Sequence, residues 1–399
     1  MVGSESESMT ADIRRRICVM TGTRAEFGLL EPLMESLASH PRFELQVLAT
    51  GSHLSRELGY TIEEVESKFK VDAKVDLDLS SDSPLGVAHS MGLGLEGFVG
   101  AFEDLGPDLL ILVGDRYEAL AVALAATLVR LPIAHIHGGE TTEGAMDEVF
   151  RHSITKMSHL HFTATEDYRQ RVIQLGESPE RVHHVGGLGV DVLSRIKLMG
   201  QEDLEKELGM KLDKFFLITF HPVTLEGSTS KEQVGALLAA LDGFEDYSLV
   251  FTKANSDTEG KVINRLLEEF VSQRNNAILV SSLGMYRYAS LLSLASGVVG
   301  NSSSGLLEAP FFGTPTLDIG DRQKGRLAGA SVHQVTADEQ TIEDGLKTIL
   351  SQKFKEHCIP EGNPYGLGGA SKRILDIIDG QETLPSLKKV FYDLPFQSN

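Results

Sequence analysis

The chain reads Leu-Pro-Ile-Ala-His-Ile-His-Gly-Gly-Glu from residue 131 to residue 140. Residues 132–136 are typical of a buried parallel strand, and His137-Gly138-Gly139 forms a turn at its carboxyl end. From Asp147 onward the sequence predicts a helix. Ligands of open α/β sheets bind just outside the carboxyl ends of the strands. The stretch therefore predicts a parallel sheet with a chemically active turn, or else a tight turn with solvated polar groups.

A second turn of the same kind precedes this one. The apolar strand 109–113 ends at Gly114-Asp115-Arg116-Tyr117-Glu118, and a helix is predicted over 119–129. Asp115 could serve only as the N-cap of that helix, which is a common role for aspartate. Consecutive strands usually lie near each other, however, so we expect Asp115 and His137 to open onto one crevice.

The N-terminal region predicts a Rossmann-like unit. A strand over 16–21 is followed by Gly22-Thr23-Arg24 and then by an amphipathic helix over 27–39. This turn is not Gly-x-Gly-x-x-Gly, so no nicotinamide cofactor is expected here. Arg24, at the start of a helix, could hold a phosphate together with backbone N–H groups, or it could be a surface charge beside Glu26.

Strands and helices alternate along the whole chain, which predicts parallel sheets covered on both faces. Further strands are predicted in the first half at 43–49, 75–79, 161–164 and 182–185, with helices at 61–67, 84–102 and 166–175. Strands of the second half are predicted at 215–220, 248–252, 277–280 and 297–300. Three glycines within 186–189 break the pattern and predict a hinge. We therefore expect an α/β fold of two Rossmann-like domains facing each other across a cleft, over 14–187 and 188–375, with a disordered leader over 1–13 and a tail over 376–399.

The strand ends of the second half also carry polar groups. His221-Pro222 follows the first strand, Lys253 to Asp257 follows the second, and Asn301-Ser302-Ser303-Ser304-Gly305 follows the fourth. The last group precedes an apolar helix predicted over 306–312, so it offers N–H and O–H donors at a positive helix end, unless it is only a serine cap. Glu308, one turn into that helix, could accept hydrogen bonds from ribose hydroxyls.

Composition excludes several classes of protein. Of the 399 residues 41% are hydrophobic and 24% are charged, which are globular values, and no apolar stretch is long enough to cross a bilayer. A formal charge of -20 disfavours nucleic acids and anionic membranes, so an anionic substrate needs a local cationic cluster. Cys18 and Cys358 form neither a disulfide framework nor a metal spacing. Without a signal peptide, a cytoplasmic protein is expected.

Seven ordered motifs between residues 14 and 375 resemble the hydrolysing UDP-N-acetylglucosamine 2-epimerases of sialic acid biosynthesis, which have the GT-B architecture. The motifs are TGTRAEFG (21–28), GDRYE (114–118), HIHGGE (135–140), RHSITKMS (151–158), FHP (220–222), GNSSSG (300–305) and GDRQKGR (320–326). The resemblance implies that UDP is eliminated with loss of the C2 proton to give 2-acetamidoglucal. Water then adds at C1 while a proton returns to the opposite face of C2, so that the products are UDP and N-acetylmannosamine. These steps require neither a metal nor another cofactor.

The resemblance also implies roles for individual residues. Asp115, His137 and Asp147 fall on the acid/base positions of the family, with Glu140 close by, and His221 falls on the position that assists the leaving phosphate. The expected substrate-binding residues are Arg24 and Arg322 for the diphosphate, Ser302 and Ser303 for phosphate or ribose, Glu308 for ribose, Tyr288 for uracil stacking, Asn255 for the sugar or the cleft, and Arg116. The partner is thus a small nucleotide sugar, and the family leads us to expect a homodimer.

One departure from the family concerns His137, because animal relatives and the non-hydrolysing branch have glutamate there. A histidine reaches both protonation states near neutral pH, so it is open which group moves which proton. Alternatives to the substrate and the activity also stay open: the same elimination on UDP-2,4-diacetamido-2,4,6-trideoxyglucose for legionaminic acid, a GT-B glycosyltransferase, and a non-catalytic sugar-nucleotide sensor.

Overall fold

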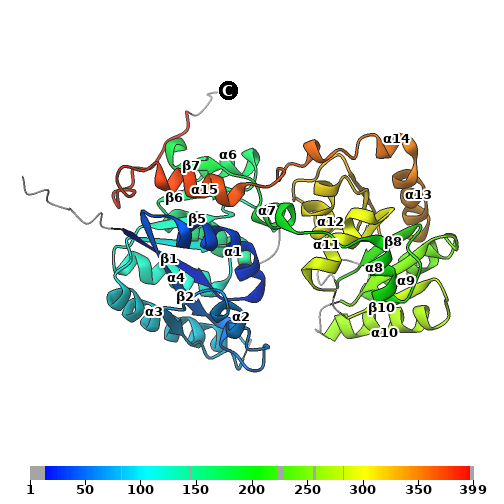
Figure 1. Cartoon of the computed structure of the whole chain (residues 1–399), viewed down its shortest axis with the longest axis horizontal. Coiled ribbons are helices and arrows are strands. Elements are labelled where there is room, and N and C mark those ends of the chain that lie inside the picture. Colours follow the sequence, from blue (N-terminus) through cyan, green and yellow to red (C-terminus); the bar gives the residue numbers. More distant parts are fainter. Residues whose placement is uncertain are drawn as a thin grey trace, which may run out of the picture. The chain divides into compact units, whose positions relative to one another are not determined.

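The computed structural model describes residues 14–81, 83–142, 146–222, 229–254, 258–281 and 283–395. These residues divide into two compact units (Figure 1). Unit 1 contains the described residues of 14–140, 146–185 and 370–395, and unit 2 contains those of 141–142 and 186–369. Each unit is built on a parallel sheet, which confirms the α/β fold class with two Rossmann-like units. No helix in the described ranges is long and apolar enough to cross a membrane.

Unit 1 has a seven-stranded parallel sheet in the order β3-β2-β1-β4-β5-β6-β7 over its described residues. In that order the strands are Ala73–Val75, Phe43–Thr50, Arg15–Thr21, Leu109–Val113, Ile133–Ile136, Leu160–Thr163 and Val182–His184. The helices of unit 1 are α1 Arg24–Ser39, α2 Ile62–Glu66, α3 Pro84–Leu105, α4 Tyr117–Leu128, α5 Met146–Met157, α6 Glu166–Gln174 and α15 Ala370–Asp379. The order reverses between β1 and β4, so the turns after β1, β4 and β5 lie along one stretch of the carboxyl edge.

Burial explains why these segments form central strands. All five residues of β4 are buried, and α3 and α4 pack their apolar sides against the same face of β1 and β4. Strand β3 differs from the strand predicted over 75–79. Its partner β2 ends at Thr50, which pairs with Val75, so no neighbour remains to extend the ladder further.

Unit 2 has a six-stranded parallel sheet in the order β10-β9-β8-β11-β12-β13 over its described residues. In that order the strands are Ala277–Val280, Ser248–Thr252, Phe215–Thr219, Gly297–Gly300, Thr316–Ile319 and Val332–Val335. The helices of unit 2 are α7 Leu188–Arg195, α8 Gln201–Leu208, α9 Ser230–Leu241, α10 Thr258–Ser272, α11 Gly284–Leu294, α12 Ser304–Leu307, α13 Glu339–Leu350 and α14 Gln352–Lys355. Strands β12 and β13 were not predicted, and the helix predicted over 306–312 is replaced by α12 and a 3-10 turn at Ala309–Phe312.

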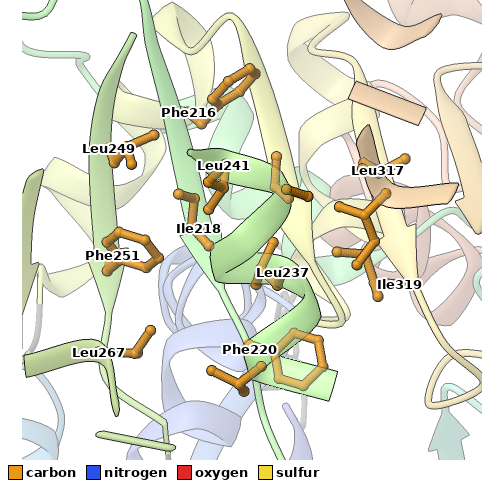
Figure 2. Close-up of a cluster of buried hydrophobic side chains, with 14 of the residues drawn as sticks. Phe216, Ile218, Phe220, Leu237, Leu241, Leu249, Phe251, Leu267, Leu317 and Ile319 are labelled. Atoms are coloured by element: carbon orange, nitrogen blue, oxygen red, sulfur yellow. The ribbon is translucent and has the colours of Figure 1, made fainter. Parts of the chain in front are cut away.

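The core of unit 2 holds the sheet between two helical layers. Figure 2 shows alternate residues of β8, β9 and β12 converging with Leu237 and Leu241 of α9. The opposite face of β8 packs against α8 and α11. Because both faces are covered, only the strand ends of this sheet can present polar groups to a ligand.

Apart from residues 141–142, which belong to unit 2, the described chain passes between the units in two places. The first passage, between Val185 and Gly186, lies beside the glycines of the predicted hinge. The second lies between Gly369 and Ala370, so residues 370–375, expected in the second domain, belong to unit 1. The reason is that α15 packs against α1, where Ile374 and Ile378 are buried.

Candidate functional site

Asp115 follows β4, but it does not cap helix α4. The N-cap is Arg116, whose side chain makes no capping hydrogen bond, so the capping interpretation of Asp115 is wrong. The Asp115 carboxylate instead forms an ion pair with Arg151 of α5, and its side chain keeps 27% of its surface exposed. The Asp115 carboxylate is therefore fixed by an ion pair and still accessible to solvent.

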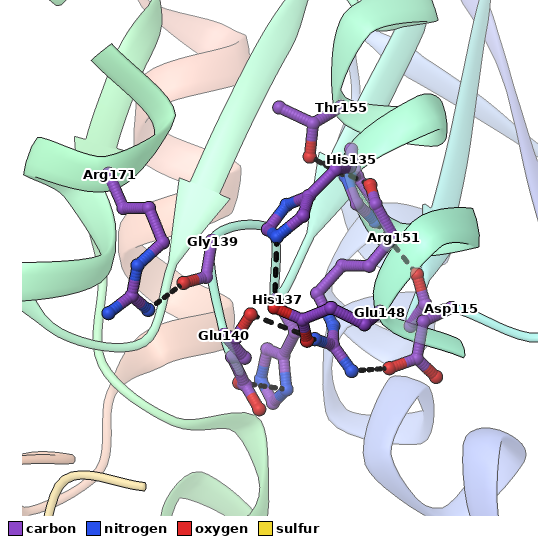
Figure 3. A network of polar contacts seen from close by, with 11 residues as sticks. Asp115, His135, His137, Gly139, Glu140, Glu148, Arg151, Thr155 and Arg171 are labelled. Carbon is purple, nitrogen blue, oxygen red and sulfur yellow. Dashed lines mark hydrogen bonds and ion pairs between the residues drawn. The ribbon is translucent and has the colours of Figure 1, made fainter. Parts of the chain in front are cut away.

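Arg151 lies at the centre of the polar cluster of unit 1. This cluster, called the first half-site, comprises Asp115, His137, Glu140, Asp147, Glu148 and Arg151. Only 3% of its side chain is exposed. One Nη atom binds Asp115, and the other donates to Glu148 Oε2 at 2.6 Å and to the Glu140 carbonyl at 2.8 Å (Figure 3). One buried guanidinium thus joins the turn after β4, the turn after β5 and the first half of α5. Its fixed fork suits this task better than a lysine ammonium would.

His137 sits in a backbone conformation that few non-glycine residues adopt. Its φ is 67°, and its N–H donates to the Phe162 carbonyl at 2.9 Å. Its Nδ1 lies 3.2 Å from Glu140 Oε1, and both side chains are about one-fifth exposed, at 19% and 21%. Left-handed backbone at a non-glycine residue is a form of local strain that clusters at functional sites. The structure thus brings His137 and Glu140 together as expected.

His135, which lies on β5 two residues before His137, is fully buried and contacts the turn after β4 and helix α5. Its Nε2 lies 2.8 Å from the Gly114 carbonyl, and its Nδ1 lies 3.2 Å from Thr155 Oγ1. Burial lowers the pKa of His135 to about 3, so the ring is neutral at ordinary pH. A neutral ring that donates from Nε2 to Gly114 fixes the turn that carries Asp115.

Asp147 lies in the first turn of α5, near Asp115. Burial, and then the negative charge of Asp115, raise the pKa of Asp147 above its ordinary value. A carboxyl group with a raised pKa keeps its proton more readily than its neighbour does. Asp147 is therefore suited to act as an acid beside Asp115.

Two arginines of unit 1 pair with carboxylates: Arg24, expected to bind the diphosphate, and Arg116, expected to bind the substrate. Arg24 Nε lies 3.0 Å from Glu64 Oε2, and its side chain is 72% exposed. Arg116 donates from two nitrogens to Glu118, at 3.2 Å each. Beside them, Glu26 accepts from the Gly22 N–H at 2.8 Å, and burial raises its pKa to about 7. Diphosphate binding by Arg24 and substrate binding by Arg116 therefore stay predictions.

The second half-site lies at the carboxyl ends of β8, β11 and β12. His221 follows β8, and its backbone N–H and C=O both bind the side chain of Asn301, which follows β11. Arg322 follows β12 and donates from Nη1 to the Asn301 carbonyl at 3.1 Å. Arg322 lies near buried Asp318, whose pKa burial raises to about 7 against the opposing effect of the Arg322 charge. His221 and Arg322, predicted from separate motifs, are thus joined by one residue.

The serines after β11 are placed where donors were expected. Ser303 is the N-cap of α12 but makes no side-chain capping bond, and Ser302 Oγ accepts from Ser304 Oγ at 3.1 Å. Both Ser302 and Ser303 are partly exposed. The Tyr288 hydroxyl binds Ser304, and its ring packs against the core of unit 2. These contacts describe a core tyrosine, and uracil stacking by Tyr288 stays a prediction.

Glu308 is the C-cap of α12, and burial raises the pKa of its carboxyl group to about 7. The folded-state pKa lies above the ordinary 4.5, so folding favours the protonated acid. This contribution to stability is complete below pH 4.5 and is lost as the pH rises to about 7.

We expect Glu308→Gln to be more stable than the wild type by up to about 3 kcal/mol at pH 8, since each pKa unit corresponds to about 1.36 kcal/mol. At pH 4.5 the two proteins should differ much less. Urea unfolding at both pH values measures the difference, with Glu269→Gln on an exposed position of α10 as the control. A Glu308→Gln advantage that does not depend on pH would contradict the effect of burial on Glu308.

Asn255 lies outside the described residues, as does the leader over 1–13. The sequence reasoning missed the roles of Arg151, His135 and Asn301, although each lies in a motif that was quoted. A signal existed for Arg151, because residues three and four apart on a helix share a face, which places it with Asp147 and Glu148. No comparable signal exists for Asn301, whose partners lie 80 and 21 residues away along the chain.

Comparison with known proteins adds a family and a fold. A family model described as UDP-N-acetylglucosamine 2-epimerase matches residues 35–379. GDP/UDP-N,N'-diacetylbacillosamine 2-epimerase (hydrolyzing) of Campylobacter jejuni is 42% identical, covering 86% of this chain and 90% of that protein. Polysialic acid biosynthesis protein P7 of Escherichia coli is 36% identical, covering 96% and 98%. The crystal structure of UDP-GlcNAc 2-epimerase from Neisseria meningitidis bound to UDP-GlcNAc has a TM-score of 0.74 at 20% identity, covering 92% and 100%.

Proposed function

Because the chain belongs to the UDP-N-acetylglucosamine 2-epimerase family, we propose that it is a hydrolysing 2-epimerase of a nucleotide-linked 2-acetamido sugar. The observation that carries the proposal is the cluster of acid/base side chains at the strand ends around Arg151. Asp115 and Asp147 supply two carboxyl groups in different environments, and His137 with Glu140 supplies a third acid/base position. A glycosyltransferase or a sugar-nucleotide sensor has no need of this acid/base set.

Two sugar nucleotides are candidate substrates. UDP-N,N'-diacetylbacillosamine, which is the 2,4-diacetamido-2,4,6-trideoxyglucose nucleotide, is favoured by the Campylobacter relative at 42% identity. UDP-N-acetylglucosamine is favoured by the seven sequence motifs and by the description of the family model. We propose the diacetamido sugar nucleotide as the preferred substrate, whereas the sequence motifs alone favoured UDP-N-acetylglucosamine. The two substrates share the reacting atoms C1 and C2, so the same steps serve both.

In the first stage a base removes the proton from C2, the C1–C2 double bond forms, and the C1–O bond breaks with its electron pair leaving on the nucleoside diphosphate. Asp115, Asp147 and His137 are the proposed acid/base groups. His221 and Arg322 support the departing diphosphate, whose added negative charge they can hydrogen-bond. Ser302, Ser303 and Glu308 hold the nucleotide.

In the second stage water adds to C1 of the 2-acetamidoglucal while a proton adds to C2 from the face opposite the one that lost it. The group protonated in the first stage cannot reach that face, so a second acid is needed. The raised pKa of Asp147 favours its protonated form, so we assign it as one candidate for this acid, with His137 as the other. The products are the free 2-epimer of the sugar and the nucleoside diphosphate.

Incubation with each nucleotide sugar, without any acceptor, tests this function. We expect free UDP and the free manno-configured sugar, formed faster from UDP-N,N'-diacetylbacillosamine than from UDP-N-acetylglucosamine. Recovery of an epimerised but still nucleotide-linked sugar would contradict hydrolysis. The absence of any free sugar from both substrates would contradict the proposed function as a whole.

A further inference from the structure

Strands β8 and β11 of unit 2 stop pairing through their backbones just before the second half-site. Their last ladder partners are Thr219 and Gly300, and the Asn301 N–H still donates to the Thr219 carbonyl at 3.1 Å. Gly300 has φ 133°, and a side chain there would collide with the Thr219 carbonyl. The two backbones therefore approach closely at this point and then diverge.

Beyond this point the Asn301 side chain, in place of a backbone peptide group, hydrogen-bonds the backbone of His221. Its Oδ1 accepts from the His221 N–H at 2.7 Å, and its Nδ2 donates to the His221 carbonyl at 2.8 Å. A carboxamide carries one acceptor and one donor side by side, as a peptide group does, so it can satisfy both backbone groups at once. Asn301 is fully buried. Loss of either bond would leave a buried polar group without its partner.

The backbone of Asn301 binds the residues that follow β12. Its carbonyl accepts from Arg322 Nη1 at 3.1 Å and from Gln323 Nε2 at 2.8 Å. Asn301 is thus the common support of His221 on one strand end and Arg322 on the next. A hydrophobic residue of the same size would keep the bonds that the backbone carbonyl accepts from Arg322 and Gln323. It would lose the two side-chain bonds to His221.

We propose that Asn301 is a positioning residue, which sets the backbone of His221 relative to Arg322 so that both side chains meet the same diphosphate. This inference rests on the proposed function, because it takes the diphosphate as the ligand of His221 and Arg322. Asn301 itself need not touch the substrate, since its buried side chain already bonds both backbone groups of His221.

The Asn301→Asp variant tests the inference, because it keeps the shape of the side chain but makes the hydrogen bond to the His221 carbonyl depend on pH. The carboxylate cannot donate, whereas the protonated carboxylic acid can donate one bond and accept one, as the amide does. Asn276→Asp is the matched control, since Asn276 Nδ2 donates to backbone carbonyls of Glu245 and Tyr247 in the turns away from the half-site.

Both kcat and the UDP dissociation constant are measured between pH 5.5 and 8.5 as ratios to the wild type. The ratios remove the titration that both proteins share at Asp318 and Glu308. Circular dichroism gives the folded fraction at each pH. We expect Asn301→Asp to lose about 30-fold in kcat and about tenfold in UDP affinity at pH 8.5, and to recover most of both losses at pH 5.5. The Asn276→Asp control should follow the wild type throughout.

Wild-type-like values at pH 8.5 would overturn the role of Asn301, and so would losses that are the same at every pH. A variant that is unfolded over the whole range would show that Asn301 serves folding and not positioning, which also overturns the inference. Failure of the wild type to release a free sugar counts against the proposed function alone, because the UDP affinity of the folded variant still reports on Asn301.

Discussion

Asp115→Asn is expected to lower kcat by about 100-fold or more while UDP affinity stays within about threefold, as when a positioned acid or base is lost. Asparagine keeps the shape of the side chain and its ability to accept a hydrogen bond from Arg151, but it cannot take a proton. UDP affinity should survive because the proposed nucleotide ligands His221, Arg322 and Glu308 belong to unit 2. Initial rates and calorimetric titration with UDP measure the two quantities.

The Asp115→Asn result is read against Asp104→Asn, an exposed position on α3 of the same unit. The control should keep full activity. Because Asp115 does not cap α4, its substitution is not expected to unfold the N-terminus of that helix. An Asp115→Asn protein that is folded and retains most of its activity would remove Asp115 from the catalytic groups.

Arg151→Ala is expected to lower the free energy of unfolding by about 3 kcal/mol and to reduce kcat at least as strongly as Asp115→Asn. The substitution removes a buried charge whose partners, Asp115 and Glu148, keep only about a quarter of their side chains exposed, at 27% and 24%. Both carboxylates then lose their ion pair with Arg151, and the Glu140 carbonyl loses the hydrogen bond that Arg151 donates. The turn that carries Asp115 and the turn that carries His137 lose their common support.

Urea unfolding and initial rates test the Arg151 substitution, with Arg265→Ala at an exposed position of α10 as a control for the loss of one positive charge. The control should change neither quantity. An Arg151→Ala protein as stable and as active as the wild type would show that the ion pairs of Arg151 contribute nothing to the half-site.

The fold followed from the sequence wherever burial alone decides it. Strands such as Leu109–Val113 are apolar throughout because helices cover both faces, and this pattern is visible without a structure. Strand β13 could not be found in this way, because its residues His333 and Gln334 face partly exposed surroundings at the sheet edge. The misplaced β3 shows the same limit, since its length depends on where its partner β2 ends.

The sequence predicted which strand ends carry the polar residues of the candidate site. It did not predict the hydrogen bonds and ion pairs that connect these residues. Titratable residues after apolar runs made Asp115, His137 and His221 candidates, because parallel strands all present their carboxyl ends at one edge. The supporting residues were not identifiable, since Asp115 meets Arg151 across 36 residues and His221 meets Asn301 across 80. Such pairings depend on strand order, which the sequence pattern does not contain.

Under the proposed function, inversion at C2 proceeds by elimination and hydration. Turnover of UDP-N,N'-diacetylbacillosamine or UDP-N-acetylglucosamine in deuterium oxide, followed by mass spectrometry and NMR of the free sugar, tests it most directly. We predict one deuterium at C2 of the manno-configured product, because the proton taken by the enzyme is not the one that returns to the opposite face. A product that carries the original hydrogen at C2 would contradict the elimination mechanism and the acid/base roles of Asp115, His137 and Asp147.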